Sequence, residues 1–262
     1  MMAHRARKRF GQNFLHDRGV IARIVQAINP ARDDRLVEIG PGRGALTEPL
    51  LAALDLLHVI EIDRDLIAAL RQRWPLERLI IHEGDVLETD FAALAADCGG
   101  PLRIVGNLPY NISTPILFNI ARAAGAISDA YFMLQREVVE RMVAAPDTAE
   151  YGRLSVSLQV RFSMDLLFTV GGGAFTPAPK VESAIVRLVP RPNVQLPPAF
   201  DRVVTQAFSM RRKTLRNSLA NTVSAAQLES LGIDPGLRAE VLHYADYQRI
   251  ARSLNAEGPG SV

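Results

Sequence analysis

Short apolar runs alternate with stretches of helical periodicity along the first 190 residues, and this alternation limits the possible folds more than any other feature. Runs typical of buried strands occupy residues 36–39, 57–62, 79–82, 102–105 and 130–134. A stretch with helical periodicity follows each of them, at about 45–54, 64–73, 91–96, 116–124 and 136–144. The alternation predicts an α/β fold, a Rossmann-like parallel sheet with helices on both faces.

The remainder of the chain predicts an edge hairpin and a second domain. Two further strand-like runs, 166–170 and 183–189, flank a loop rich in glycine and proline, and we expect them to pair antiparallel at one edge of the sheet. A proline cluster within 190–198 then indicates a linker, and 199–254 have helical periodicity. We therefore expect a catalytic domain over residues 1–190 and a small, all-helical RNA-binding domain with a loose tail over 191–262.

Composition narrows the cellular setting. The single cysteine, Cys98, excludes an internal disulfide and is typical of a reducing cytosol. No apolar run approaches the roughly 20 residues that cross a bilayer, and the basic N-terminal segment lacks the apolar core of a secretory signal. We expect a cytoplasmic protein without a membrane anchor. No cluster of Cys, His and carboxylate residues has the spacing of metal ligands, so we also expect no metal.

Charge is distributed unevenly along the chain. Residues 1–30 carry a net charge of +5 and residues 191–262 a net charge of +3, whereas residues 31–100 carry −7. Nearly all the basic residues are arginine, which binds phosphate bidentately and stacks on bases, although a compositional bias toward arginine would give the same count. The pattern predicts a polyanion held by the two ends, and a cationic or polyhydroxylated ligand near the acidic segment.

Three features at successive strand ends predict a nucleoside cofactor. The loop at 38–44 reads Glu-Ile-Gly-Pro-Gly-Arg-Gly, a G-x-G-x-G spacing that differs from the pattern for a dinucleotide pyrophosphate. Glu61 ends the second strand and can accept from both hydroxyls of a ribose, while Asp85 follows the third strand and can accept from an adenine amino group. Each acid could instead be only a helix N-cap. Ribose and adenine without a phosphate indicate S-adenosylmethionine, whose sulfonium is cationic.

The tetrapeptide Asn107-Leu-Pro-Tyr110 follows the fourth strand and predicts the chemistry. A side-chain amide oxygen and a backbone carbonyl can accept the two N–H bonds of an exocyclic amino group, whose lone pair is otherwise delocalised into the base. Pro109 fixes the corner, and Tyr110 can stack on a base taken out of its helix. The alternative interpretation is an ordinary Pro-Tyr turn after a strand.

With these residues, the chain resembles the small-subunit ribosomal RNA adenine dimethyltransferases, which dimethylate two adjacent adenosines near the 3′ end of 16S rRNA. Residues 8–15 are similar to the N-terminal signature of that family, 175–183 to its late loop and 211–216 to its C-terminal signature. The resemblance spans about residues 7–254. It implies methyl transfer from S-adenosylmethionine to 16S rRNA within the small ribosomal subunit, and a role in subunit biogenesis.

Position by position, the resemblance implies the site residues. The expected cofactor-binding residues are Gln12, Asn13, Leu15, Gly40, Gly42, Glu61, Ile62, Asp85, Val86 and Asn107. The expected catalytic residues are Asn107, Leu108, Pro109, Tyr110 and Phe175, with Tyr110 and Phe175 on either side of the flipped adenine. Three glycines at 171–173 depart from the family pattern and make the segment before Phe175 more mobile than the corner that carries Tyr110.

Two basic patches are expected to contact RNA, although a solvated tail and an exposed helix face are the ordinary meanings of such runs. The expected RNA-binding residues are Arg7, Lys8, Arg9, Lys180, Arg211, Arg212, Lys213 and Arg216. Residues 145–152 have the composition of a mobile loop near the pocket. Nothing in the sequence requires more than a monomer.

Four alternatives remain open from the sequence. The same chemistry could act on large-subunit rRNA, as in macrolide-resistance methyltransferases, although the signature at 211–216 favours the small-subunit enzymes. A DNA amino-methyltransferase would usually have Pro-Pro-aromatic at the corner. The protein could be an assembly factor whose catalysis is incidental, and a nicotinamide dehydrogenase is disfavoured by the glycine spacing.

Overall fold

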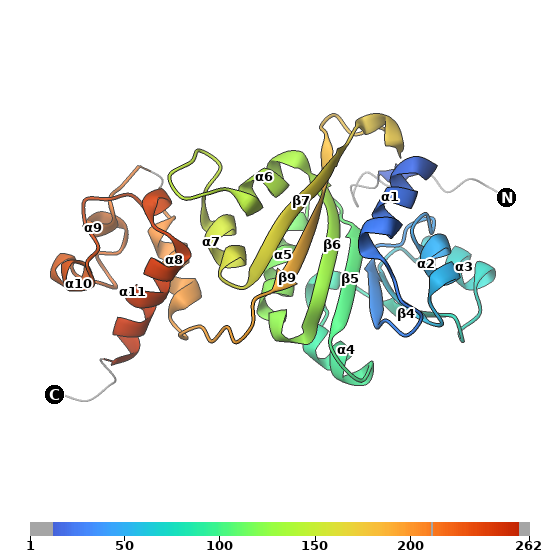
Figure 1. The fold of residues 1–262 in the computed structure, drawn as a ribbon, viewed down its shortest axis with the longest axis horizontal. Helices are drawn as coiled ribbons and strands as arrows, with labels where there is room; N and C mark the ends of the chain where they lie inside the picture. Colours follow the sequence, from blue (N-terminus) through green and yellow to red (C-terminus); the bar gives the residue numbers. More distant parts are fainter. Residues whose placement is uncertain (1–12, 211, 257–262) are drawn as a thin grey trace. The chain divides into compact units, whose positions relative to one another are not determined.

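The structure is a computed structural model that describes residues 13–210 and 212–256. Within these residues a seven-stranded sheet has the order β4-β3-β2-β5-β6-β9-β7 (Figure 1). Its strands are β2 (Leu36–Ile39), β3 (Leu57–Glu61), β4 (Leu79–Glu83), β5 (Leu102–Asn107), β6 (Ile127–Gln135), β7 (Phe162–Val170) and β9 (Ser183–Pro190). The strands β2 to β6 pair parallel, and β9 joins β6 antiparallel. The predicted α/β, Rossmann-like class is confirmed.

Helices connect the parallel strands, as expected for βα units. They are α2 (Thr47–Ala53), α3 (Arg64–Arg73), α4 (Phe91–Asp97), α5 (Ser113–Arg122) and α6 (Arg136–Val143). Aspartates cap several of them: the side chain of Asp63 accepts from the backbone of Asp65 at the start of α3, and Asp90 accepts from Ala92 and Ala93 at the start of α4. The central strands are apolar on both faces, with Leu36 and Ile104 fully buried, because helices cover both sides.

Two elements near the N-terminus were not predicted. Helix α1 (Arg18–Ile28) precedes the sheet, and the Asp17 side chain caps it by accepting from Val20. Strand β1 (Phe14–Leu15) pairs antiparallel with β8 (Phe175–Thr176), so Leu15 lies opposite Phe175. This short ribbon joins segments that are far apart in the sequence and brings the N-terminal part of the described chain to the late loop.

The chain divides into two compact units, and the second begins earlier than expected. It comprises residues 140–162 together with those from Arg191 onward, whereas the first contains the residues up to Val139 and 163–190. The sequence had assigned 140–162 to the first domain. The segment groups with the second unit because the Tyr151 hydroxyl donates to the Leu242 carbonyl at 2.9 Å, and because Arg161 binds both carboxylate oxygens of Asp201.

The regular structure of the second unit is almost entirely helical over its described residues. It contains α7 (Arg153–Gln159), α8 (Phe200–Ala207), α9 (Leu215–Ser218), α10 (Ala225–Ser230) and α11 (Tyr244–Ala256). Its core includes Phe200, Val204, Leu215 and Tyr247, all nearly inaccessible to solvent. The segment 145–152 belongs to this unit, and the Asp147 N–H donates to the Glu240 carbonyl at 2.8 Å. Among the described helices, none combines the length and apolar character needed to span a membrane.

Candidate active site

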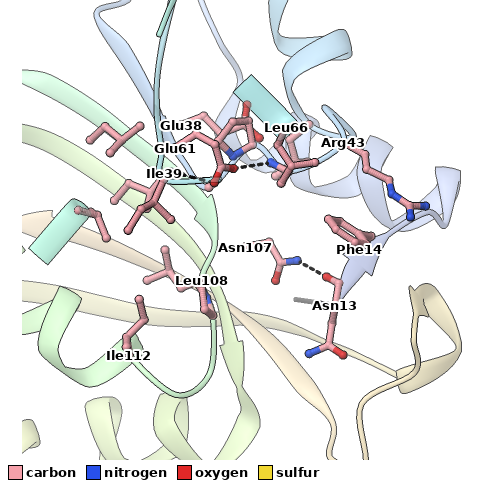
Figure 2. Close-up of a pocket in the computed structure, with 18 of the residues that line it drawn as sticks. Asn13, Phe14, Glu38, Ile39, Arg43, Glu61, Leu66, Asn107, Leu108 and Ile112 are labelled. Carbon is pink, nitrogen blue, oxygen red and sulfur yellow. Dashed lines mark hydrogen bonds between the residues drawn. The ribbon is translucent and has the colours of Figure 1, made fainter. Parts of the chain in front are cut away.

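A cavity of about 260 Å³ opens at the carboxyl ends of the parallel strands in the first unit (Figure 2). This is the edge at which open α/β sheets bind their ligands. Every predicted cofactor-binding residue within the described chain lines it: Asn13, Leu15, Gly40, Gly42, Glu61, Ile62, Asp85, Val86 and Asn107. Leu108, Pro109 and Tyr110 line it as well. The structure therefore brings the two predicted groups, cofactor-binding and base-binding, into one cavity.

The glycine loop after β2 is shaped by backbone conformation. Gly40 and Gly42 have φ values of 64° and 57°, the left-handed region that disfavours residues with a Cβ. A Cβ placed on Gly40 would find no atom within 4 Å, so the chain leaves open space beside this residue. The Gly40 N–H donates to the Ile60 carbonyl at 2.9 Å, which ties the loop to the end of β3. A ligand can therefore approach the backbone of this loop closely.

Glu61, at the end of β3, is oriented by backbone donors. One carboxylate oxygen accepts from the N–H groups of Ile62 and Asp63, both at 2.9 Å, and the other accepts from Gly42 at 3.3 Å. Burial raises the pKa of this carboxyl, while the three N–H bonds act in the opposite direction by favouring the ionised form. The long Gly42 bond is the weakest of the three, and leaves acceptor capacity on the oxygen that faces the loop.

Glu38 lies in β2 just before the glycine loop and lines the cavity, and the sequence analysis assigned it no role. Its side chain is only 2% exposed, and Thr47 donates a hydrogen bond of 2.6 Å to it. Burial, and secondarily the nearby Glu61, raises the pKa of Glu38 to about 7, although the Thr47 bond counteracts this. A signal existed in its position directly before the glycine loop, where a strand end meets the cavity.

Asp85 follows β4, where it caps a short helix and also lines the cavity. One of its oxygens accepts from the Leu87 N–H at 2.9 Å and so caps a short 3-10 helix over Val86–Glu88. The N-cap interpretation of this acid is thus realised, yet Asp85 also lines the cavity. Ile62 and Leu87 also line the cavity, with 47% and 36% of their surfaces exposed, and these apolar side chains are suited to a flat ring.

The Asn107 side chain is held by a segment 94 residues away. Its amide nitrogen donates to the backbone carbonyl of Asn13 at 2.9 Å, as Figure 2 shows. Because a carbonyl has no proton to give, this bond fixes which end of the amide is nitrogen and leaves the oxygen as the acceptor on the other side. The adjacent Leu108 is 1% exposed, and its N–H donates to Met133 in β6 at 3.1 Å. The corner therefore offers an amide oxygen at a defined position.

Tyr110 lines the cavity, whereas Phe175 does not. The Tyr110 hydroxyl lies 2.6 Å from the Ser183 hydroxyl at the start of β9. Phe175 is 3% exposed and packs into the hydrophobic core around Leu15, its β-ribbon partner. Phe175 is therefore not among the residues that line the cavity, and its place beside the flipped adenine stays a prediction.

The expected RNA-binding residues are only partly described. Lys180 is exposed on the late loop of the first unit, and Arg212, Lys213 and Arg216 are exposed in the second unit. The remaining predicted residues, Arg7, Lys8, Arg9, Arg211 and the cofactor residue Gln12, lie outside the described residues. Over 13–210 and 212–256, no group of three or more His, Cys, Asp or Glu residues could hold a metal ion.

Comparisons with known proteins identify the family. The model of the ribosomal RNA adenine dimethylase family matches residues 3–256. The chain belongs to that family. Membership confirms the predicted resemblance and the predicted enzyme class, an rRNA methyltransferase that uses S-adenosylmethionine.

Relatives and solved structures agree with this assignment. The ribosomal RNA small subunit methyltransferase A of Aromatoleum aromaticum is 57% identical over 266 residues, covering 100% of this chain and 99% of that protein. The protein with the same name from Thiobacillus denitrificans is 57% identical over 255 residues, with 96% and 98% covered. The crystal structure of a dimethyladenosine transferase from Plasmodium falciparum has a TM-score of 0.80 at 25% identity, covering 94% and 98%. That of the 23S rRNA methyltransferase ErmE has a TM-score of 0.68 at 27% identity, covering 93% and 100%.

Proposed function

We propose that this rRNA adenine dimethylase methylates the N6 atoms of two adjacent adenosines near the 3′ end of 16S rRNA, twice each, within the small ribosomal subunit. The observation that carries the proposal is the fixed Asn107 amide, whose oxygen is left as an acceptor in the same cavity that the glycine loop and Glu61 line. The similarity to small-subunit enzymes at 57% identity over nearly the whole chain supports 16S rRNA as the substrate.

The glycine loop and the two acids hold the cofactor. The open space beside Gly40 accommodates the methionine end, and Glu61 accepts from the ribose, with a ribose hydroxyl replacing the long 3.3 Å bond from Gly42. Asp85 accepts from the adenine amino group while Ile62 and Val86 contact the ring. These acidic residues suit S-adenosylmethionine, a cofactor that has no phosphate and supplies a methyl group already activated by its positive sulfur.

The Asn107 corner presents the nucleophile. The Asn107 oxygen and the Leu108 carbonyl accept the two N–H bonds of the target N6, which directs the nitrogen lone pair toward the methyl group. When bound, S-adenosylmethionine would supply the methyl group and leave as its neutral thioether, and the methylated N6 held by the corner would lose a proton to water. No protein base is required because the attacked amine becomes strongly acidic. A second round, with fresh cofactor, converts the monomethyl product into dimethyladenosine.

The helical unit supplies RNA contacts in this proposal. Arg212, Lys213 and Arg216 are exposed there and Lys180 is exposed on the first unit, so their side chains can reach phosphates. We assign the residues up to 139 and 163–190 to catalysis, and 140–162 with the residues from 191 onward to RNA binding. The enzyme would act as a monomer in the cytoplasm, where small subunits mature.

The test is methyl transfer from labelled S-adenosylmethionine to small subunits that lack the modification, with the product mapped by nuclease digestion and mass spectrometry. We expect dimethyladenosine at two adjacent positions near the 3′ end. Label confined to large-subunit RNA would instead support the function of ErmE, the alternative that its TM-score of 0.68 keeps open. Absence of transfer despite intact binding of cofactor and subunit would favour an assembly factor.

A further inference from the structure

Tyr110 and Ser183 form a hydrogen bond that the proposed reaction does not explain. Their hydroxyl oxygens are 2.6 Å apart although 73 residues separate them in the chain. Ser183 is fully buried, at 0% exposure, while Tyr110 is half-buried and lines the cavity. A serine hydroxyl buried this completely would be costly without a partner, and the Tyr110 hydroxyl is its partner.

Ser183 and the corner that carries Tyr110 are both held against the same stretch of β6. Ser183 pairs with Gln135 in the antiparallel β6–β9 register, and Asn107 pairs with Met133 in the parallel β5–β6 register. The Leu108 N–H donates to the Met133 carbonyl at 3.1 Å, so the corner that carries Tyr110 is bonded two residues from the partner of Ser183. The serine hydroxyl is thus a fixed point relative to the corner.

A fixed point at the tip of the ring restricts how the ring moves. The Tyr110 hydroxyl lies on the long axis of the ring, and the first side-chain torsion sets the direction of that axis. A bond at the hydroxyl therefore restrains this torsion and holds the ring axis in place. Burial raises the pKa of the Tyr110 phenol, so it stays protonated and able to hydrogen-bond at neutral pH. A ring already held in place loses less conformational freedom when a base stacks on it.

We infer that Ser183 is a positioning residue for methyl transfer: its hydroxyl fixes the direction of the Tyr110 ring axis, so that the ring lies where the flipped adenine stacks. The inference rests on the proposed function, because it requires an adenine in the cavity. Ser183 ends the late loop, and its bond to Tyr110 links this segment to the base-binding corner.

The experiment is a double-mutant cycle of Ser183→Ala and Tyr110→Phe, measured by methyl transfer to unmethylated small subunits and by thermal unfolding. Each single substitution should lower kcat about 3- to 10-fold, the usual effect of one hydrogen bond, with KM for S-adenosylmethionine unchanged. The double variant should be about as slow as the slower single variant, without recovery of kcat. Its thermal stability should recover relative to the single variants, because no hydroxyl is left buried without a partner.

The recovery of stability separates positioning from a purely structural role. If the hydroxyl pair only holds the fold together, kcat should recover with the melting temperature in the double variant, and the inference would be wrong. It would be equally wrong if the two rate losses multiplied, because Ser183 would then act independently of Tyr110.

Ser113→Ala is the matched control. The Ser113 hydroxyl donates to the backbone carbonyl of Tyr110 at 3.2 Å, and Ser113 is 1% exposed, but it does not touch the ring hydroxyl. Its effect should multiply with that of Tyr110→Phe, which contrasts with the Ser183 cycle. Failure of the unsubstituted enzyme to methylate would contradict the proposed function and this inference with it, whereas methylation with multiplying losses would contradict the inference alone.

Discussion

The two ends of the cavity are built from different kinds of contact. At the cofactor end, Glu61 accepts from Ile62 and Asp63, its immediate neighbours, and from Gly42, 19 residues away. At the base end, Asn107 is held by Asn13 across 94 residues, and Tyr110 by Ser183 across 73. The cofactor end is therefore largely determined by local sequence, whereas the base end takes shape only when β1 pairs with β8 and β9 joins the large sheet.

This difference separates the two steps of the reaction. Changes at the cofactor end should weaken binding of S-adenosylmethionine and leave the geometry of attack intact. Changes at the base end should slow methyl transfer once both substrates are bound, because a small misplacement of a nucleophile lowers the rate steeply. Each of the following variants tests whether the two ends of the cavity act separately.

The largest effect is expected for Asn107→Ala. The substitution removes the acceptor for the target amino group and the donor to the Asn13 carbonyl together, so kcat should fall about 100-fold or more. Single-turnover methylation of small subunits measures this. Sedimentation with the subunits and the melting temperature are the controls, and both should be close to those of the unsubstituted enzyme. A variant that lost subunit binding in parallel with kcat would contradict the assignment of Asn107 to chemistry.

Glu61→Gln tests the cofactor end. The glutamine oxygen can still accept from Ile62 and Asp63, but its NH₂ group would face the Gly42 N–H, placing donor against donor. Affinity for S-adenosylmethionine should fall about 10- to 100-fold, the usual cost of losing a bond to a charged group, while kcat at saturating cofactor stays close to normal. Calorimetric titration measures the affinity.

Glu48→Gln provides the matched control for that experiment. Glu48 forms an exposed ion pair with Arg73 at 2.9 Å, so the same chemical change should leave the affinity for S-adenosylmethionine unchanged. A fall in kcat for Glu61→Gln at saturating cofactor would show that the cofactor end and the base end are coupled and do not act separately.

Local signals account for what the sequence predicted well. The strands at 36–39 and the helix at 64–73 were placed with their observed limits, since buried apolar runs and capping residues act over a few positions. For the same reason, residues later found at the cofactor end were recognised at successive strand ends. Glu38 was missed because a carboxylate buried at a strand end looks, in sequence, like any residue before a glycine loop.

Long-range contacts account for what could not be predicted. The two-residue strands β1 and β8 have no periodicity to detect, and each exists only through its partner more than 150 residues away. The burial of Phe175 and the bond between Tyr110 and Ser183 follow from that pairing and from β9. The grouping of 140–162 with the helical unit likewise depends on distant partners, Leu242 and Asp201.

Glu38→Gln should change how stability depends on pH. The folded-state pKa of about 7 exceeds the ordinary value of 4.5, so the folded state holds a proton that the unfolded chain releases. The free energy of unfolding should therefore fall as pH rises from about 4.5 to 7, by roughly 2–3 kcal/mol in total. Glutamine removes this dependence and can still accept from Thr47.

Urea unfolding of both proteins between pH 4 and 8 measures the difference. The free energy of unfolding of Glu38→Gln, relative to that of the unsubstituted protein, should be higher at pH 8 than at pH 4. Burial lowers the pKa values of His58 and His82, which gives the opposite slope, but this contribution cancels when the two proteins are compared. Parallel curves would mean that Glu38 does not hold a proton in the folded state, and that its local contacts suffice to keep it ionised.

The smallest effects are expected for two glycine substitutions, one at the base end of the cavity and one at the cofactor end. In Gly106→Ala the new Cβ would lie 2.7 Å from the Ile39 carbonyl oxygen, a backbone atom that cannot turn aside. We expect destabilisation of about 1–3 kcal/mol and a lower kcat, because the strand shifts directly before Asn107.

In Gly40→Ala the space is open, but φ is 64°, which costs about 1–2 kcal/mol. That variant should raise KM for S-adenosylmethionine and keep kcat. Gly125→Ala, with no atom within 4 Å and no positive φ, should change neither stability nor kinetics appreciably. If Gly40→Ala lowered kcat as much as Gly106→Ala does, the glycine loop would position the methyl group for attack as well as bind the cofactor, and the division between a local cofactor end and a long-range base end would fail.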